Sequence, residues 1–82
     1  MSTETTSCTL EQLVVGQQAT IVKVGGEKTI RRRLLDMGLI TGETIRLERI
    51  APLGDPIEVF VKGYHLSLRK HEASHILVEV QS

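Results

Sequence analysis

The sequence predicts a small, mainly β domain, a barrel or a sandwich, with one short α-helix. Several short segments alternate apolar and polar residues with a period of two, as half-buried strands do. Only one segment repeats its apolar residues at helical spacing, and glycines or prolines separate the segments. Because 82 residues suit one hydrophobic core, we expect a single domain.

The N-terminal residues 1–8 are rich in serine and threonine and are predicted to form a disordered tail, followed by the folded domain at residues 9–82. Thr9 and Gln12 fit a capping box, which predicts a short helical turn that places Leu10 and Leu13 on the core. Residues 19–24 then alternate as a strand that is rich in β-branched side chains.

The α-helix is predicted over residues 29–37. Ile30, Leu34 and Met37 follow the i, i+4, i+7 spacing of one helix face. Gly38 stands where a helix end favours a residue with positive φ, so the chain can turn there. We therefore expect Leu39 to pack back on Leu34.

Three further strands are expected after the helix. Residues 43–50 alternate, but Ile50 is out of phase, which indicates a bulge or a bend. Residues 57–62 alternate again, and the short connection PLGDP at 52–56 predicts an antiparallel hairpin between the two strands. Leu66 and Leu68 lie two apart after Gly63, and residues 76–80 alternate as the last strand.

Composition limits the possible functions. Ten basic and ten acidic side chains cancel, so the chain lacks the long-range positive field typical of nucleic-acid-binding proteins. The single cysteine, Cys8, cannot form an internal disulfide, and no secretory signal is evident, which favours the cytoplasm. No apolar run reaches the ~18 residues that a membrane-spanning helix needs.

Several blocks of the sequence, spread over residues 10–80, resemble the ferrous iron transport protein A (FeoA) family. The blocks are RLLDMGL at 33–39, Gly42, APLGDPI at 51–57 and GYHLSLR at 63–69. The resemblance implies a small SH3-like β-barrel, cytosolic and without catalytic activity. It also implies work beside FeoB, a membrane protein that imports Fe(II) and carries a cytosolic GTP-binding domain.

That resemblance makes the cytosolic domain of a ferrous iron transporter the expected partner. We expect the contact residues to be exposed side chains near the two distinctive loops, namely Arg31, Arg32, Leu39, Leu53, Asp55 and Tyr64. No cofactor is expected. An alternative is a metal-responsive regulatory domain that binds iron or zinc, since similar small barrels occur in metal-dependent repressors.

The segment HEASH at 71–75 matches the zinc-peptidase pattern H-E-x-x-H, which needs both imidazoles on one helix face. Residues 76–80 read as a strand, so we expect His71 and His75 to lie apart at the start of an edge strand and reject the peptidase. A weaker possibility is that His65, His71, His75 and Cys8 meet in space and bind Fe(II) or Zn(II).

The densest charge run is Lys28 with Arg31, Arg32 and Arg33, expected on the solvent side of the helix. A protein partner with an acidic or phosphate-bearing surface fits these arginines better than nucleic acid does, because few aromatic side chains are present to stack on bases. The segment GGEKT at 25–29 is not a P-loop, because Ile21 replaces the first glycine of that motif.

Overall fold

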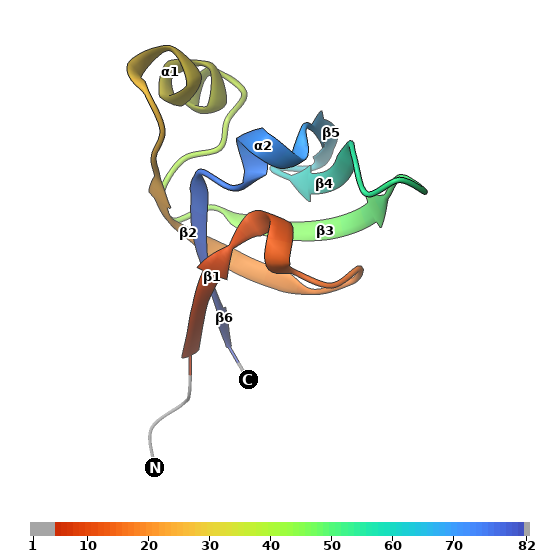
Figure 1. Cartoon of the computed structure of the whole chain (residues 1–82). Helices are drawn as coiled ribbons and strands as arrows, with labels where there is room; N and C mark the ends of the chain where they lie inside the picture. The colour runs from red at the N-terminus through yellow and green to blue at the C-terminus, as the bar shows by residue number, and fades with distance from the viewer. Residues whose placement is uncertain (1–4, 82) are drawn as a thin grey trace.

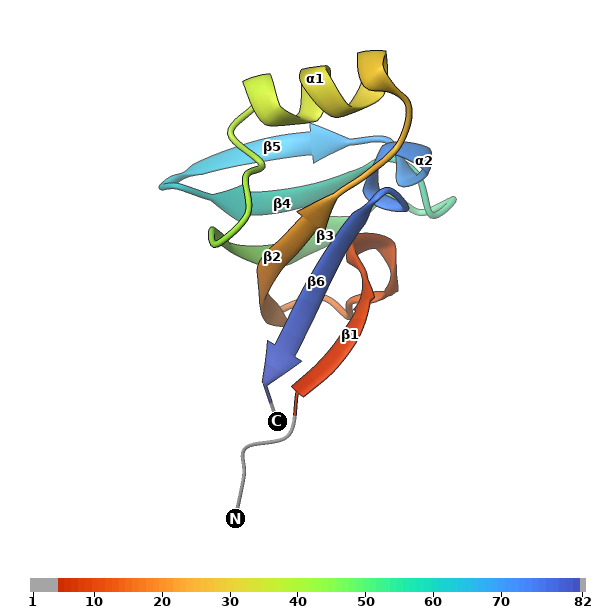
Figure 2. The same cartoon turned by 90° about the vertical axis from the view of Figure 1, so that its left-hand side faces the viewer.

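Six strands form one antiparallel sheet in the order β1-β6-β2-β3-β4-β5 in the computed structural model, which describes residues 5–81. The strands are β1 (Thr5–Thr9), β2 (Gln18–Val24), β3 (Thr44–Ile50), β4 (Ile57–Val61), β5 (Tyr64–Leu68) and β6 (Ile76–Gln81). The helical elements are the 3-10 turn η1 (Leu10–Gln12), α1 (Lys28–Asp36) and the single turn α2 (Lys70–Ala73). The sheet curls round its core, and α1 lies across one end of it (Figures 1 and 2).

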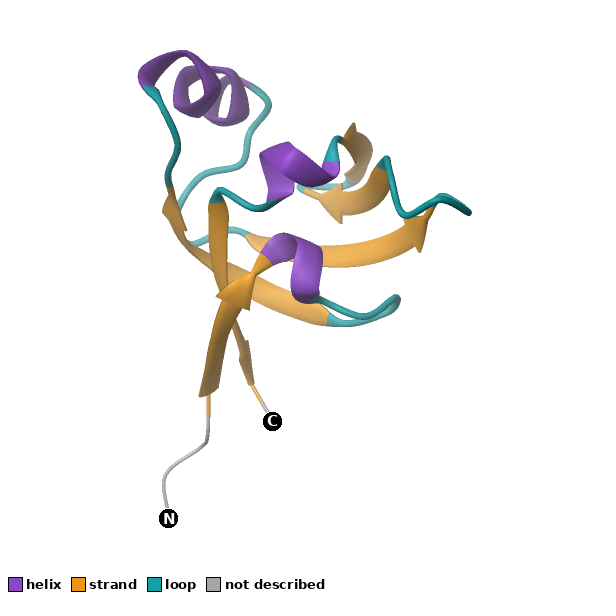
Figure 3. Ribbon diagram, viewed as in Figure 1, coloured by secondary structure: helices purple, strands orange, loops and turns teal. Residues whose placement is uncertain are grey.

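The predicted mainly β fold and its helix are confirmed, and the core combines buried side chains of the strands with those of η1, α1, α2 and the loops that follow η1 and α1. Figure 3 shows how short loops join the strands to the three helical segments. The core consists of Leu10, Leu13, Ala19, Ile21, Val24, Leu34, Leu39, Ile45, Leu47, Ile57, Val59, Val61, Leu68, Ala73, Ile76 and Val78.

The predicted tail at residues 1–8 is wrong for residues 5–8, which form most of β1. This strand pairs with β6 over its whole length, with Cys8 opposite Val78. The strand was missed because backbone hydrogen bonds to a distant segment hold it, and its small polar side chains carry no apolar pattern. Residues 1–4 lie outside the described residues.

The η1 turn forms as predicted. The side-chain oxygen of Gln12 accepts a hydrogen bond of 2.9 Å from the Thr9 amide. This bond satisfies a backbone donor at the start of the turn, as a capping box does. Leu10 and Leu13 are buried in the core.

The α1 helix ends in a Schellman motif, as its sequence indicates. Gly38 has φ +93°, and its amide donates to the Leu35 carbonyl at 3.0 Å. The Leu39 amide donates to the Leu34 carbonyl at 3.1 Å, and both side chains are buried. Ile30 and Met37 are only partly buried, against the edge of the core.

Two β-bulges decide which side chains face the core. In β2 the register with β6 shifts between Ile21 and Lys23, so Val24 becomes buried in place of Lys23. Strict alternation after Ile21 would have buried Lys23. In β3 a shift between Leu47 and Arg49 confirms the expected break in phase.

The segment before β6 is helical for one turn, although no helix was predicted there. The α2 turn begins where the Glu72 carboxylate accepts a hydrogen bond of 3.0 Å from the Arg69 amide. Also, β6 lies between β1 and β2, so it is an interior strand and not the edge strand that we expected.

Candidate functional site

The exposed face of α1 carries most of the basic charge run. Lys28, Arg31 and Arg32 are exposed, and with Leu35 and Asp36 they line a shallow hollow of about 510 Å³. The Arg31 Nε donates a hydrogen bond of 3.3 Å to the Val24 carbonyl, which ties the start of the helix to the end of β2. The predicted solvent-facing position is therefore confirmed for these three cations.

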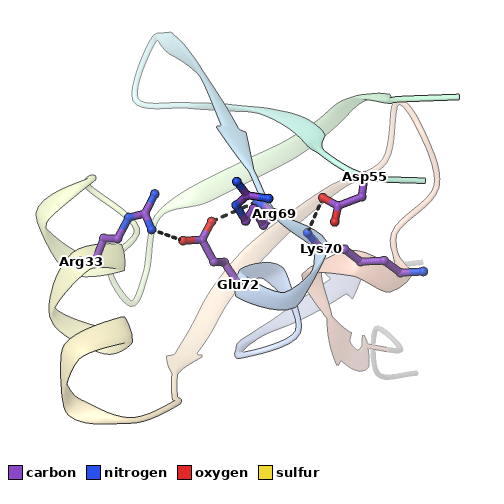
Figure 4. A network of polar contacts seen from close by, with 5 residues as sticks. All are labelled: Arg33, Asp55, Arg69, Lys70 and Glu72. Carbon is purple, nitrogen blue, oxygen red and sulfur yellow. Dashed lines mark hydrogen bonds and ion pairs between the residues drawn. The ribbon is translucent and has the colours of Figure 1, made fainter. Parts of the chain in front are cut away.

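Arg33 differs from its basic neighbours because it joins α1 to α2. Its guanidinium lies 2.7 Å from the Glu72 carboxylate, whose side chain is only 7% exposed. The other Glu72 oxygen accepts from the Arg69 amide, and the Lys70 amide donates to Asp55 at 3.0 Å (Figure 4). These contacts fix α1, α2 and the β3–β4 turn relative to one another.

The β3–β4 turn presents one apolar side chain to solvent. The Ala51 carbonyl accepts a hydrogen bond of 2.7 Å from the Gly54 amide, and Gly54 has φ +90°. Leu53, at the tip, is 96% exposed. Asp55 is exposed too, but its carboxylate binds the Lys70 amide, so it holds the turn in place.

Tyr64 connects two of the sequence blocks that suggested the family. Its hydroxyl donates a hydrogen bond of 2.6 Å to the Met37 carbonyl, at the end of α1, and its ring stays 40% exposed. A Cβ on Gly38 would lie 2.5 Å from that hydroxyl oxygen, so a glycine is needed there for space as well as for φ. Tyr64 is therefore partly exposed to solvent and also holds the end of α1 in place.

Leu39 was expected to pack back on Leu34 and was also named as an exposed contact residue; it is fully buried, so the second expectation is wrong. It follows the glycine that ends α1, and the Schellman geometry directs its side chain back onto Leu34. Its role is in the core, so it is not available for direct contact with a partner.

The imidazoles of His71 and His75 lie side by side, contrary to the expected separation. Their ring centroids are 5.0 Å apart at an interplanar angle of 85°. They meet because the α2 turn brings residue 71 above residue 75 before the chain enters β6. The Nε2 of His75 is buried and has no hydrogen-bond partner within residues 5–81.

The other candidate metal ligands are engaged elsewhere. His65 packs edge-on against Phe60, with centroids 4.9 Å apart, and its Nδ1 lies 3.8 Å from a Glu48 oxygen. Cys8 is half-buried in β1. Among residues 5–81, no three histidine, cysteine, aspartate or glutamate side chains are grouped to hold a metal ion. Glu72 of the HEASH segment is bound to Arg33 and Arg69, so it is not free to act as a general base.

Sequence reasoning missed the contact between Arg33 and Glu72. Arg33 was grouped with its exposed neighbours, and Glu72 was considered only as part of a zinc motif. No periodicity links residues so far apart in the chain, so only the folded structure brings them together.

No helix in the described part of the chain is long and apolar enough to span a membrane. The curled sheet of short antiparallel strands, with one helix inserted between β2 and β3, defines a small β-barrel domain of the SH3-like class. Its charged side chains make structural contacts or lie on the surface.

The chain belongs to the FeoA domain family, whose family model matches residues 8–80. A relative from Porphyromonas gingivalis, an Fe(2+) transport protein A/Fe(2+) transporter FeoB fusion protein, is 42% identical over 73 residues. The match covers 89% of this chain but only 9% of that relative.

Two solved structures show the same fold. The FeoA-like protein from Clostridium acetobutylicum has a TM-score of 0.85 at 39% identity, covering 98% of this chain and 90% of that one. FeoA from Stenotrophomonas maltophilia, described as a prokaryotic SH3-domain protein and solved in complex with zinc, has a TM-score of 0.74 at 31% identity. Here the match covers 85% of this chain and 87% of that one. The predicted family and SH3-like fold are confirmed.

Proposed function

We propose that this chain is a non-enzymatic, cytoplasmic accessory domain of a ferrous iron uptake system, and that it binds the cytosolic GTPase-bearing part of the Fe(II) transporter. The observation that carries the proposal is the Porphyromonas gingivalis fusion protein, which joins a homologous domain to FeoB in one polypeptide. Tethering keeps two domains at high effective concentration, which is useful when they work in contact. The two parts would associate through a surface of this domain.

The candidate contact surface has two separate parts, the exposed face of α1 and the turn at Leu53. Arg31 and Arg32 offer planar guanidinium groups that bind carboxylates or phosphates bidentately. Leu53 adds an exposed apolar side chain of the kind that docks into a pocket. Asp55 and Tyr64 support this surface through their contacts with Lys70 and Met37.

The contacts between α1, α2 and the β3–β4 turn make this surface pre-organised. The Arg33–Glu72 ion pair holds α1, and the bond from Lys70 to Asp55 holds the turn. Less conformational entropy is then lost on binding, which favours affinity. The proposed mechanism is contact alone, with no reaction on this chain.

Charge reversal tests the proposal. Binding of the transporter's cytosolic domain is measured by calorimetry for the parent and for the double variant Arg31→Glu/Arg32→Glu. We expect affinity to fall about tenfold or more, which is about 1.4 kcal/mol, and the parent's affinity to fall with added salt. Stability should fall by no more than about 1 kcal/mol, because exposed charges add little to folding and Arg31→Glu removes one partly buried hydrogen bond, to the Val24 carbonyl.

The matched control is Arg49→Glu, an exposed cation on β3 and not on α1. It should bind as the parent does. If the α1 double variant binds normally and Leu53→Ala does not bind, the partner contacts the turn and not α1. No binding by the parent protein would refute the proposed function.

The alternative function, a metal-responsive domain, has one observation in its favour: the Stenotrophomonas maltophilia relative was solved with zinc. In this chain His71 and His75 lie close enough to be considered as a pair. Two imidazoles are half of the four ligands that a structural zinc site uses, and among residues 5–81 no third histidine, cysteine, aspartate or glutamate is grouped with them. We therefore propose no resident metal.

A further inference from the structure

The strand β5 lies at one end of the sheet order and pairs only with β4. Lys62 and Gly63, with φ +53° and +85°, form the two-residue turn between the two strands, so Val61 and Tyr64 exchange both backbone hydrogen bonds. Alternation along an antiparallel pair then directs the backbone groups of every second residue of β5 away from β4.

The outward backbone groups belong to His65 and Ser67. Neither residue's amide or carbonyl makes a turn, loop or side-chain hydrogen bond in the described part of the chain. The edge therefore offers two amide donors and two carbonyl acceptors in the geometry of a missing neighbouring strand. Such an edge is a template for an extended peptide.

A basic hollow lies at the end of this edge. Its volume is about 290 Å³, and it is lined by Arg33, Pro56, Ser67, Leu68, Arg69 and Glu72. The charge of Glu72 is taken up by Arg33, whereas the exposed Arg69 guanidinium makes no ion pair within residues 5–81. Glu58 lies opposite Ser67 on β4, and the Asp55 carboxylate accepts from the Lys70 amide.

We propose that the free edge of β5 binds an extended acidic segment of a protein partner, which adds to the sheet as a seventh strand with a carboxylate on Arg69. The inference rests on the proposed function for the partner's identity, because the segment would belong to the transporter's cytosolic part. Backbone pairing supplies affinity, and the guanidinium selects acidic sequences.

Charge complementarity distinguishes this occupant from a second copy of the chain. Pairing β5 with β5 of another copy would offer Arg69 no carboxylate, because residues 62–71 include Lys62, Arg69 and Lys70 but no acidic residue. Pairing β5 with β1 of another copy would offer Arg69 no carboxylate, because residues 5–9 are threonine, serine and cysteine.

The test uses the full chain labelled with nitrogen-15 and a blocked peptide, Thr-Val-Glu-Val-Glu-Val-Thr, at millimolar concentration. We expect the largest amide shifts, and slowed hydrogen exchange, at His65 and Ser67. A peptide with lysine in place of glutamate should bind at least tenfold more weakly. Shifts that avoid His65 and Ser67, an absence of shifts, or equal binding of both peptides would overturn the proposal.

Two matched pairs of variants separate the edge from general effects. Ser67→Pro removes the outward amide and places a ring on the edge, while no ladder bond to β4 is lost, so the fold should persist. It should abolish peptide binding, whereas Ser67→Ala should not. Arg69→Glu should remove the preference for the acidic peptide, and Arg49→Glu should leave that preference unchanged. The comparison of Arg69→Glu with Arg49→Glu tests the proposed acidic preference even if Ser67→Pro fails to fold.

The transporter's cytosolic domain then separates this proposal from the proposed function. If Ser67→Pro binds that domain as tightly as the parent does, the transporter does not use the β5 edge, so the proposed occupant is wrong while the proposed function stands. If the peptide binds at β5 but the transporter's domain does not bind at all, the edge site stands and the proposed function fails.

Discussion

Replacing Leu34 with alanine tests whether α1 is anchored to the core as described. The Leu34 side chain is 0% exposed and is the fully buried anchor of the helix. Leucine-to-alanine changes at such sites cost about 2–5 kcal/mol, and more when the cavity cannot collapse. Alanine favours helix at least as well as leucine, so the loss would come from packing and not from helix propensity.

The surroundings of Leu34 indicate that the loss of unfolding free energy lies in the upper half of that range. The helix is tied down by the Arg33–Glu72 ion pair and by the bond from Tyr64 to the Met37 carbonyl, so α1 cannot settle freely into the cavity. A domain of 82 residues has about 4–12 kcal/mol of stability in total. We therefore expect Leu34→Ala to lower the melting temperature by about 10 °C or more, or to unfold the domain.

Thermal and urea unfolding, followed by circular dichroism, measure this effect. The control is Leu53→Ala, which removes the same atoms from a side chain that is 96% exposed and should change stability by no more than about 0.5 kcal/mol. A Leu34→Ala melting curve that matches the parent's, or a Leu53→Ala change of equal size, would refute the reasoning about the core.

Three further predictions concern the turn, the buried carboxylate and metal content. Gly54→Val should cost about 1–3 kcal/mol through its φ of +90° alone, because a Cβ there meets no atom within 4 Å. When binding is expressed per folded molecule, Gly54→Val should weaken transporter binding more than the core variant Val59→Ala does. Equal losses would show that the turn has a structural role only. Glu72→Gln should lower the urea-unfolding free energy by about 1 kcal/mol, because the ion pair to the largely exposed Arg33 is lost while a hydrogen-bond acceptor remains. An unchanged free energy would show that the charge adds nothing. Elemental analysis of dialysed protein should find no stoichiometric zinc, and one retained zinc that disappears in His75→Ala would contradict this.

The local pattern of the sequence predicted much of the framework. The alternation of residues 57–62, the capping box at Thr9 and the glycine after Met37 each depend on neighbours within a few residues, and all three appear in the structure as predicted. Such signals are reliable because side-chain periodicity and turn geometry act over one or two turns of chain. The family blocks likewise identified the fold.

The site was less predictable, because its features depend on contacts between distant segments. The expected exposure is confirmed for Arg31, Arg32 and Leu53 but is wrong for Leu39, whose burial follows from the geometry after Gly38. The pairing of His71 with His75 was missed, because it required a helical turn too short to show a period.

The sequence by itself determined most of the strands, where α1 ends and to which family the chain belongs, because those properties depend on residues close together in the chain. Only the tertiary structure decided that residues 5–8 form a strand, that Arg33 pairs with Glu72 and that β5 keeps a free edge. Strand order and ion pairing arise from backbone and charged groups that meet after the chain has closed long loops. The energy of those contacts depends on the whole fold and leaves no local pattern in the sequence.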